Sequence, residues 1–243
     1  MGMLQSITRL PNGMIGVAAG HFDGLEHVHR VGAVPSMSQG QSGTVWDVDD
    51  TDYPWASFSA ANTLTIDRDS ASDADKIVLV EGLDENYHRV SEEVTLTNAT
   101  GNATTQSFIR VQRASLTNGS SINAGDITVN KSTTTVAKIV TGQGMSLMAI
   151  YTVPAGYTGY LLQGACTCQA GADATGNMFV RYFGNDSFTI GHAFEVSGTG
   201  GQYYYPFLVP LSIPEKSDID VRVKVRSNNA RLTAAFCVLL EAN

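Results

Sequence analysis

The segment spanning residues 218–227, DIDVRVKVRS, strongly constrains the fold because hydrophobic and charged residues alternate through most of it. Ile219, Val221, Val223 and Val225 take every second position, and the residues between them are charged. Successive side chains of a β-strand point to opposite faces of the sheet. The alternation therefore predicts a strand with one buried face and one solvated, charged face.

Other short β-rich runs follow one another from about residue 56, separated by turn residues. They include KIVLVEGLD, SEEVTLTNATGN, NMFVRYFGND and RLTAAFCVLL. A chain with 24 glycines, 43% hydrophobic residues and only 16% charged residues suits short strands joined by many turns. The sequence predicts an all-β fold with sandwich or jelly-roll-like units.

The two halves of the chain do not align with one another, so we expect two unlike β units in tandem. Residues 45–140 are predicted to form the first β domain and residues 141–243 a second, jelly-roll-like sandwich. Residues 1–44 mix Gly, Pro and Ser with scattered apolar residues and show no sustained period. Because such a segment buries little surface alone, an extended, irregular arm lying on another surface or subunit is expected.

Charge and hydropathy exclude two classes of partner. The formal net charge is −8 and no basic run occurs, whereas phosphate neutralisation needs clustered Lys and Arg. No apolar stretch approaches the roughly 20 residues needed to span a bilayer. We therefore expect neither a nucleic acid nor a membrane as partner.

Four aspartates lie within residues 45–55, VWDVDDTDYPW, between two tryptophans. These are Asp47, Asp49, Asp50 and Asp52. An EF-hand loop counted from Asp47 fails at its fifth, sixth and twelfth positions, which are Thr51, Asp52 and Phe58. A calcium site of another type stays open as a weak candidate. A solvated turn between buried tryptophans is the favoured interpretation.

Histidines and cysteines give no complete metal motif. His27 and His29 would share one face of a strand, with His21 nearby, but zinc normally takes three or four ligands and no cysteine is close. Surface or interface histidines are therefore expected.

The chain has three cysteines, an odd and small number that does not form a disulfide framework and suits a reducing cytosol. Cys166 and Cys168 are expected to be buried thiols on one strand face with Tyr160 and Leu162, and Cys237 to be buried as well.

No hydrolase, nucleotide-binding or zinc-protease motif occurs, so neither an enzymatic activity nor a cofactor is predicted. A polysaccharide-cleaving enzyme would need carboxylates facing one another across a cleft, and the sequence indicates none. The run Tyr203, Tyr204 and Tyr205 could form an aromatic platform for a sugar. Alternatively, it packs alternately into a core and a subunit interface.

Three segments carry a family resemblance: GLDENYHRVSEEVTL at residues 82–96, FIRVQRASL at 108–116 and YTVPAGYTGYLL at 151–162. With the residues around them, from about 27 to 241, the chain resembles a family of virion structural proteins of tailed bacteriophages of marine and other aquatic bacteria. These segments mark a fold and not a catalytic site. The aspartate-rich stretch departs from the glycine-rich segment expected after the tryptophan, so the resemblance does not support a metal site there.

The resemblance implies a virion component made in the host cytoplasm. We expect a head decoration (cement) or minor capsid protein, a homo-oligomer and specifically a trimer, attached to the major capsid protein. Phe22, His27, His29 and Trp46 are the expected capsid or subunit contacts. The alternatives are a tail or fibre component that binds host-surface glycan, or a head–tail connector component.

Overall fold

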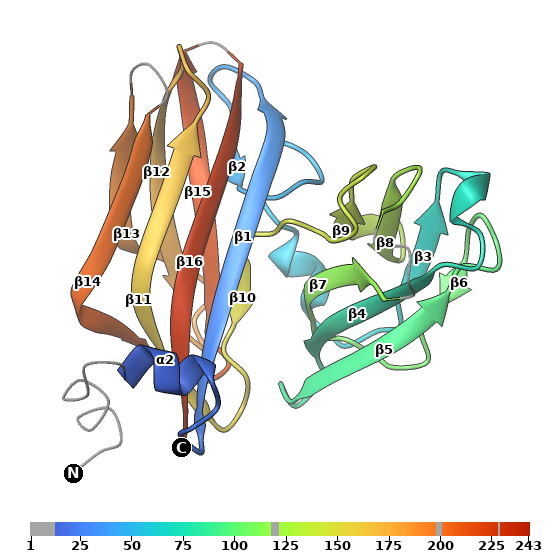
Figure 1. Cartoon of the computed structure of the whole chain (residues 1–243), viewed down its shortest axis with the longest axis horizontal. Coiled ribbons are helices and arrows are strands. Elements are labelled where there is room, and N and C mark those ends of the chain that lie inside the picture. The colour runs from blue at the N-terminus through green and yellow to red at the C-terminus, as the bar shows by residue number, and fades with distance from the viewer. Residues whose placement is uncertain (1–12, 118–121, 198–200, 228) are drawn as a thin grey trace.

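The computed structural model describes residues 13–117, 122–197, 201–227 and 229–243. Strands dominate, and they form two units that lie side by side in Figure 1. Every described strand pair is antiparallel. The prediction of an all-β fold is confirmed.

The larger unit, here called the sandwich, consists of two sheets. In the described part of the chain one sheet has the order β1 (Leu25–Met37), β16 (Ala230–Ala242), β11 (Tyr157–Cys168), β14 (Gln202–Ile213). The other has the order β10 (Ile150–Thr152), β15 (Asp218–Ser227), β12 (Asp173–Arg181), β13 (Thr189–Val196), and β2 (Ser42–Thr44) also pairs with β15. A short helix, α2 (Gly13–Ala18), lies at one end of the sandwich.

The two sheets of the sandwich share one hydrophobic core. The alternating residues of β15 are buried in it, as predicted: Ile219, Val221, Val223 and Val225. Phe236 and Leu161 from the opposite sheet meet them. At roughly 25 cal/mol for each Å² of apolar surface removed from water, this core is the main stabilising term of the sandwich.

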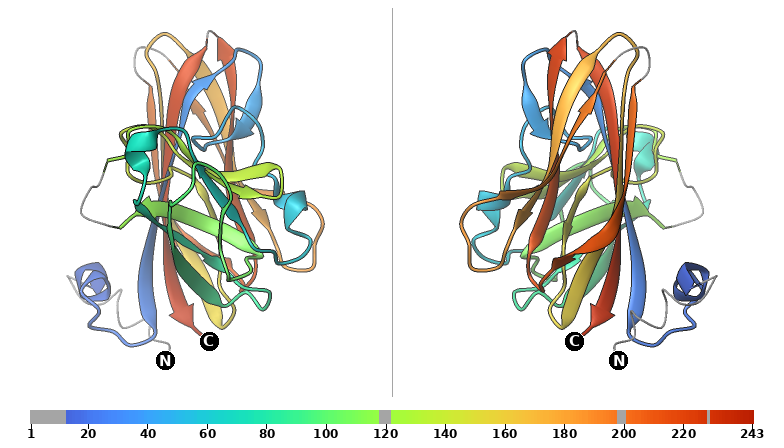
Figure 2. Two further views of the ribbon diagram at one scale, coloured as in Figure 1. Left: turned by 90° about the vertical axis from the view of Figure 1, so that its right-hand side faces the viewer. Right: turned by 90° about the vertical axis from the view of Figure 1, so that its left-hand side faces the viewer.

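The smaller unit, here called the inserted unit, has its own core and its own sheets. Among described residues, one sheet has the order β6 (Asn102–Ala103), β3 (Thr65–Arg68), β8 (Ile127–Lys131), β9 (Thr134–Ile139). The second has the order β5 (Arg89–Thr95), β4 (Ile77–Leu83), β7 (Arg110–Leu116). Two 3₁₀ turns, η1 (Trp55–Phe58) and η2 (Ala71–Asp73), belong to the same unit. Figure 1 shows it to one side of the sandwich, and the views of Figure 2 show it in front of the sandwich and behind it.

The units are nested and not in tandem. The chain builds β1 and β2 of the sandwich, forms the inserted unit, and returns to the sandwich at β10. An isolated antiparallel bridge between Trp46 and Met148 joins the outgoing and returning segments. The backbone N–H of Ala149 donates to the carbonyl oxygen of Val45 at 2.9 Å beside it.

The prediction of an irregular arm over residues 1–44 is wrong for residues 25–37 and 42–44. Strand β1 pairs with β16 from Leu25 opposite Glu241 to Met37 opposite Ala230. The arm lacks an obvious period because the second half of β1 contains Gly32, Pro35 and Ser36, and the partner strand lies at the far end of the sequence. Residues 1–12 lie outside the described part of the chain.

Strand β11 contains an irregularity that changes which residues share a face. Its register with both neighbouring strands shifts between Leu161 and Gln163. Cys166 and Cys168 consequently join the sandwich core, whereas Tyr160 and Leu162 pack against Leu239 in a separate cluster. The four residues predicted to share one face are therefore divided between two faces. An inserted β-bulge residue reverses the alternation that follows it.

Candidate functional site

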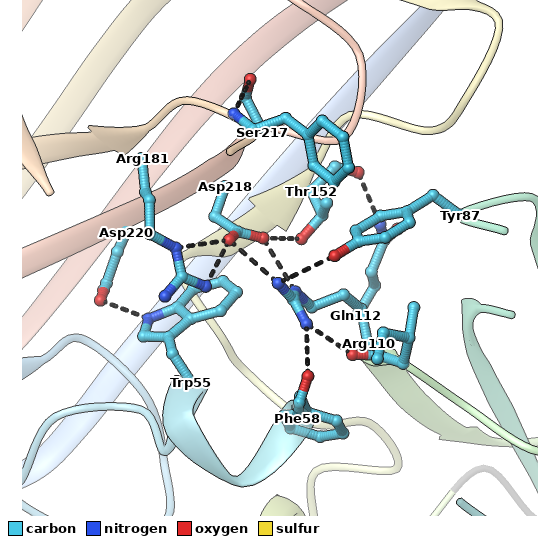
Figure 3. A network of polar contacts seen from close by, with 12 residues as sticks. Trp55, Phe58, Tyr87, Arg110, Gln112, Thr152, Arg181, Ser217, Asp218 and Asp220 are labelled. Atoms are coloured by element: carbon cyan, nitrogen blue, oxygen red, sulfur yellow. Dashed lines mark hydrogen bonds and ion pairs between the residues drawn. The ribbon is translucent and has the colours of Figure 1, made fainter. Parts of the chain in front are cut away.

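The two units meet at a buried network of polar contacts centred on Asp218 of β15 (Figure 3). Arg110 of β7 donates from Nε to Oδ1 at 2.9 Å and from Nη2 to Oδ2 at 3.2 Å. Arg181, at the end of β12, donates to Oδ2 from Nε at 2.9 Å and from Nη2 at 2.6 Å. The hydroxyl of Thr152 donates to Oδ1 at 2.6 Å. One carboxylate therefore joins strands of both units.

A second buried carboxylate, Asp220, lies two residues along β15 and ties the aspartate-rich stretch to the sandwich. It accepts hydrogen bonds from Trp55 Nε1 at 2.8 Å, Thr44 Oγ1 at 2.9 Å and Arg222 Nε at 2.8 Å. Burial raises the pKa of Asp220, and the nearby Arg222 opposes this effect. Arg222 also pairs with Asp52 at 2.7 Å.

These two carboxylates correct the sequence-based view of β15, whose charged face was predicted to be solvated. Asp218 and Asp220 are only 2% and 0% exposed. Asp218 binds arginines of two other strands. Asp220 binds Trp55 and Thr44 from other segments, together with an arginine of β15 itself. A buried carboxylate is tolerated when charged donors satisfy its oxygens. The pattern of alternation alone could not distinguish a solvated charge from one that is paired across a junction.

A cavity of about 360 Å³ opens beside this network, between η1 and the segment that follows β12. Its walls include Trp55, Tyr87, Arg110, Arg181 and Phe183. Arg110 and Arg181 are both bound to Asp218, and Arg110 Nη1 also donates to the carbonyl oxygen of Ile109 at 2.7 Å. These ion pairs with Asp218 therefore hold the inserted unit against the sandwich.

The four aspartates between the tryptophans do not converge on a common point. Asp49 accepts from Thr51 N at 2.9 Å and from its hydroxyl at 2.6 Å, whereas Asp52 pairs with Arg222. Asp50 Oδ2 accepts from the backbone N–H of Ser38 at 3.4 Å. Among described residues, no group of three or more His, Cys, Asp or Glu side chains could hold a metal ion.

Asp47 differs from the other three because it is buried with 0% exposure, contrary to the expected solvated turn. Its Oδ2 accepts from the backbone N–H of Leu147 at 2.8 Å, and its Oδ1 has no hydrogen-bond partner among described residues. Burial raises the pKa of Asp47 to about 7. The carboxyl lies where the chain leaves and re-joins the sandwich, so its ionisation places a buried charge at that junction.

The predicted contact residues Phe22, His27, His29 and Trp46 lie in different environments. His27 and His29 are exposed on one face of β1, and burial together with the neighbouring His29 lowers the pKa of His27. Phe22 is partly buried against a small cluster that includes Leu25. Trp46 is 1% exposed inside the core of the inserted unit, so its side chain is not available to a partner. His21 is also exposed.

The three consecutive tyrosines of β14 do not form one flat platform. Tyr203 and Tyr205 stack at 6.4 Å with an angle of 7° between their rings, and His192 of β13 stacks on Tyr205 at 4.3 Å. His192 Nε2 and the Tyr203 hydroxyl are 2.7 Å apart. The Tyr204 hydroxyl instead donates to Gln163 at 2.9 Å. Alternation along the strand separates the rings.

Strands β13 and β14 carry an exposed hydrophobic surface, here called the apolar edge. It comprises Ile190, Tyr204, Tyr205, Leu208 and Val209. Leu208 is 96% exposed and Val209 is 83% exposed, values that are exceptional for aliphatic side chains in a strand. Both strands lie at the edges of their sheets, adjacent to one another in Figure 1.

The conformation of β14 explains this exposure. Leu161 of β11 pairs with Leu211, but the next paired position joins Gln163 to Pro206, so the residues between them fall outside the regular register. Sequence reasoning missed Leu208 and Val209. The available signal is the run YYYPFLVPL, which is apolar without alternation and holds two prolines, residues typical of edge strands.

The described residues contain no helix long and apolar enough to cross a bilayer. All three cysteines are free and buried, as expected. Burial, with a contribution from Cys168, raises the pKa of Cys166 to about 12.

No known protein family and no curated protein sequence matches this chain. Two solved structures of infectious bursal disease virus show a distant likeness. The Gx strain is 10% identical, with a TM-score of 0.23 over 90% of this chain and 71% of that chain. The T=1 particles derived from the same virus are 11% identical, with a TM-score of 0.17 over 91% of this chain and 75% of that chain. Likeness at these TM-scores supports no inference about the fold or function of this chain.

Proposed function

We propose that this chain is a structural component of a bacteriophage virion, a head decoration (cement) or minor capsid protein that stabilises the capsid lattice. The observation that carries the proposal is the apolar edge, above all the near-complete exposure of Leu208 and Val209. Leu208 and Val209 are consecutive along β14, and an exposed apolar patch marks a surface that a partner covers. The resemblance of residues 27–241 to virion structural proteins of tailed bacteriophages is the reason for placing this partner in a virus particle.

The proposed partner of the apolar edge is a second copy of the same chain, within a homo-oligomer and specifically a trimer. Edge strands with unpaired backbone groups are ready-made surfaces for association between chains. Closed rotational symmetry then places the edge of each copy against its neighbour. The oligomer attaches to the major capsid protein, with His27 and His29 on the exposed face of β1 and Phe22 near them as further contacts.

The proposed mechanism is mechanical, with no enzymatic activity and no cofactor. Because the inserted unit is fixed to the sandwich through Asp218, a load applied to one unit passes to the other. The net charge of −8 suits a part that faces solvent and not packaged DNA. Synthesis in the host cytoplasm suits a chain with three free cysteines.

Quantitative mass spectrometry of purified particles tests this function through the copy number of the chain relative to the major capsid protein. For a head decoration protein, we expect a copy number in a fixed ratio to that of the major capsid protein. A small copy number, with the chain only in isolated tails, contradicts a head decoration role and favours the tail alternative. Absence from purified particles contradicts any virion role.

One observation favours a tail or fibre component that binds host-surface glycan: the ring of Tyr204 is 61% exposed. Flat aromatic faces suit the apolar face of a sugar ring. A glycan array probed with the assembled protein and with Tyr204→Ala tests this alternative. Phe183→Ala is the matched control, since Phe183 is 59% exposed outside the apolar edge. Binding lost only in Tyr204→Ala supports glycan recognition, and no binding contradicts it. A head–tail connector would instead show ring symmetry in the particle.

A further inference from the structure

A second cleft, of about 320 Å³, lies between β1 of the sandwich and strands β4, β5 and β7 of the inserted unit. Its polar lining comprises Glu26, Arg30, Glu81, Arg89, Ser91 and Gln112, and Tyr151 forms part of its wall. This volume lies at the lower end of the range for small-molecule sites, roughly 300–1,000 Å³. The cleft is therefore large enough for a small ligand or for one group of a larger one.

The charged side chains that line this cleft are two carboxylates and two arginines, but only one of the two arginines is paired. Glu26 pairs with Arg89 at 2.6 Å, and Glu81 pairs with Arg113, outside the lining, at 2.5 Å. Each carboxylate thus already has an arginine. Arg30 is the lining arginine that forms no ion pair within the described part of the chain.

Neutral groups satisfy the Arg30 guanidinium only in part. Its Nη2 donates to Gln112 Oε1 at 3.1 Å, and its central carbon lies 5.0 Å from the centre of the Tyr151 ring. Its Nε is shielded from solvent and has no hydrogen-bond partner among described residues. Burial lowers the pKa of Arg30; Tyr151 and Glu81 oppose this effect, whereas Arg113 and Arg89 reinforce it. An enclosed cation with an unsatisfied donor is unfavourable without a counter-charge.

Gln112 holds this guanidinium in a defined place. While its Oε1 accepts from Arg30, its Nε2 donates to the carbonyl oxygen of Thr152 at 2.7 Å. The Tyr151 ring supports the guanidinium from one face. A planar guanidinium that is positioned in this way matches the oxygens of a carboxylate or a phosphate.

We propose that this cleft binds a small oxyanion, the carboxylate or phosphate group of a ligand, through Arg30. Glu26 and Glu81 stay bound to their own arginines, so the incoming anion meets one unpaired positive charge and a neutral amide. The site is independent of the proposed assembly role. If the cleft binds no anion, the proposal that the apolar edge mediates assembly is unaffected.

Thermal unfolding of the full chain tests the site with sodium acetate as the carboxylate probe and sodium phosphate as the phosphate probe. Sodium chloride at equal ionic strength is the reference. A saturable rise in melting temperature of about 3–6 °C is expected at ten times the dissociation constant. A response to acetate identifies a carboxylate ligand, and a response to phosphate alone identifies a phosphate ligand. No rise with either probe overturns the proposal.

Arg30→Met removes the charge and keeps the length of the side chain, so the anion-specific rise is expected to vanish. Arg226→Met is the matched control, because Arg226 lies on β15 outside the cleft and its side chain is 62% exposed. The control is expected to keep the full response. An equal response in Arg30→Met overturns the proposal.

A direct binding measurement covers the case in which Arg30→Met does not fold. The fluorine resonance of trifluoroacetate is expected to broaden in the presence of the native protein and to broaden several-fold less with Arg30→Lys. Lysine keeps the charge but lacks the planar fork. A linewidth that the native protein leaves unchanged overturns the proposal for carboxylates, and equal broadening with both proteins overturns the role of Arg30.

Discussion

Arg110 of the inserted unit and Asp218 of the sandwich form a two-pronged ion pair across the junction of the units, with an Nε–Oδ1 distance of 2.9 Å and an Nη2–Oδ2 distance of 3.2 Å. The side chains are only 7% and 3% exposed. Because Arg181 binds the same carboxylate from β12, the contact links β7, β12 and β15. Asp218 is therefore a central contact between the two units, alongside the hydrogen bond of Trp55 to Asp220.

Arg110→Met is expected to lower the free energy of unfolding by about 3–5 kcal/mol, the usual effect of removing one partner of a buried pair. The carboxylate of Asp218 keeps Arg181 and Thr152 as donors, which places the loss at the lower end of that range. Urea unfolding measures the change.

Arg226→Met is the control for this substitution, because the pair of Arg226 with Glu195 is exposed and has a distance of 3.6 Å. Its effect is expected to stay below about 0.5 kcal/mol. Equal losses in the two variants would show that the Asp218 network does not fix the junction.

Stability is expected to fall as the pH rises from about 4 to about 7, owing to Asp47. The pKa of this carboxyl is raised to about 7 by burial, whereas an unfolded aspartate titrates near 4. Between these values the folded state holds a proton that the unfolded state releases, so deprotonation disfavours folding.

Asp47→Asn is therefore expected to stabilise the protein by about 1–3 kcal/mol at pH 8 and to change little at pH 4. Denaturant titrations at the two pH values measure this. Asp23→Asn removes a charge at an exposed position and is expected to follow the wild-type pH profile. A destabilised Asp47→Asn protein at pH 8 would mean that the charged form is needed at the junction.

Gly32→Ala is expected to destabilise the sandwich by about 1–3 kcal/mol, the typical cost of overpacking. A methyl group at Gly32 would collide with the carbonyl oxygen of Val45 and the backbone N–H of Ala149, where the chain leaves and re-joins the sandwich. Backbone atoms held by a hydrogen bond cannot move aside cheaply. Thermal unfolding measures the effect.

Gly164→Ala provides the control, since a methyl there would lie 3.5 Å from Met178 Cε, an ordinary contact. Its melting temperature is expected to stay near that of the wild type. If Gly32→Ala is tolerated equally well, β1 is not packed tightly against the segments that connect the units.

Cys166 is expected to resist alkylation by iodoacetamide at pH 8 in the native protein. Only the thiolate reacts, and burial raises the pKa of Cys166 to about 12 while leaving 1% of the residue exposed. Mass spectrometry should show that its labelling follows global unfolding in denaturant. Rapid labelling of native protein would place β11 outside the sandwich core.

Local patterns predicted the all-β class and the buried face of β15, because alternation is a property of neighbouring residues. They could not show that β1 pairs with β16, since the two strands lie at opposite ends of the sequence. The bulge of β11 and the insertion between β2 and β10 are likewise set by pairing between distant segments. Alternation predicts a solvated position for Asp220, because the pattern carries no sign of Trp55 and Thr44, which bind it from other elements.

The candidate site was predictable only in part. The exposed Tyr204 belongs to the tyrosine run that the sequence analysis names as a possible contact surface. Leu208 and Val209 were not predicted to be exposed, because aliphatic residues in a strand are usually buried. Trp46 was taken for a contact residue, although its large ring belongs to the core of the inserted unit. No sequence pattern marks Arg30, because its lack of an ion pair among described residues depends on how the other charges of the cleft are paired in the fold.

The oligomeric mass in solution, measured by light scattering after size-exclusion chromatography, tests the central claim most directly. The wild-type protein is expected to have the mass of a trimer of the 25.9 kDa chain. Leu208→Asp combined with Val209→Asp places two charges on the apolar edge and is expected to give a folded monomer. The control Ile122→Asp, at a position 60% exposed on the inserted unit, is expected to remain trimeric. A wild-type protein that stays monomeric as its concentration rises, or a double variant that remains trimeric, would contradict assembly through β14.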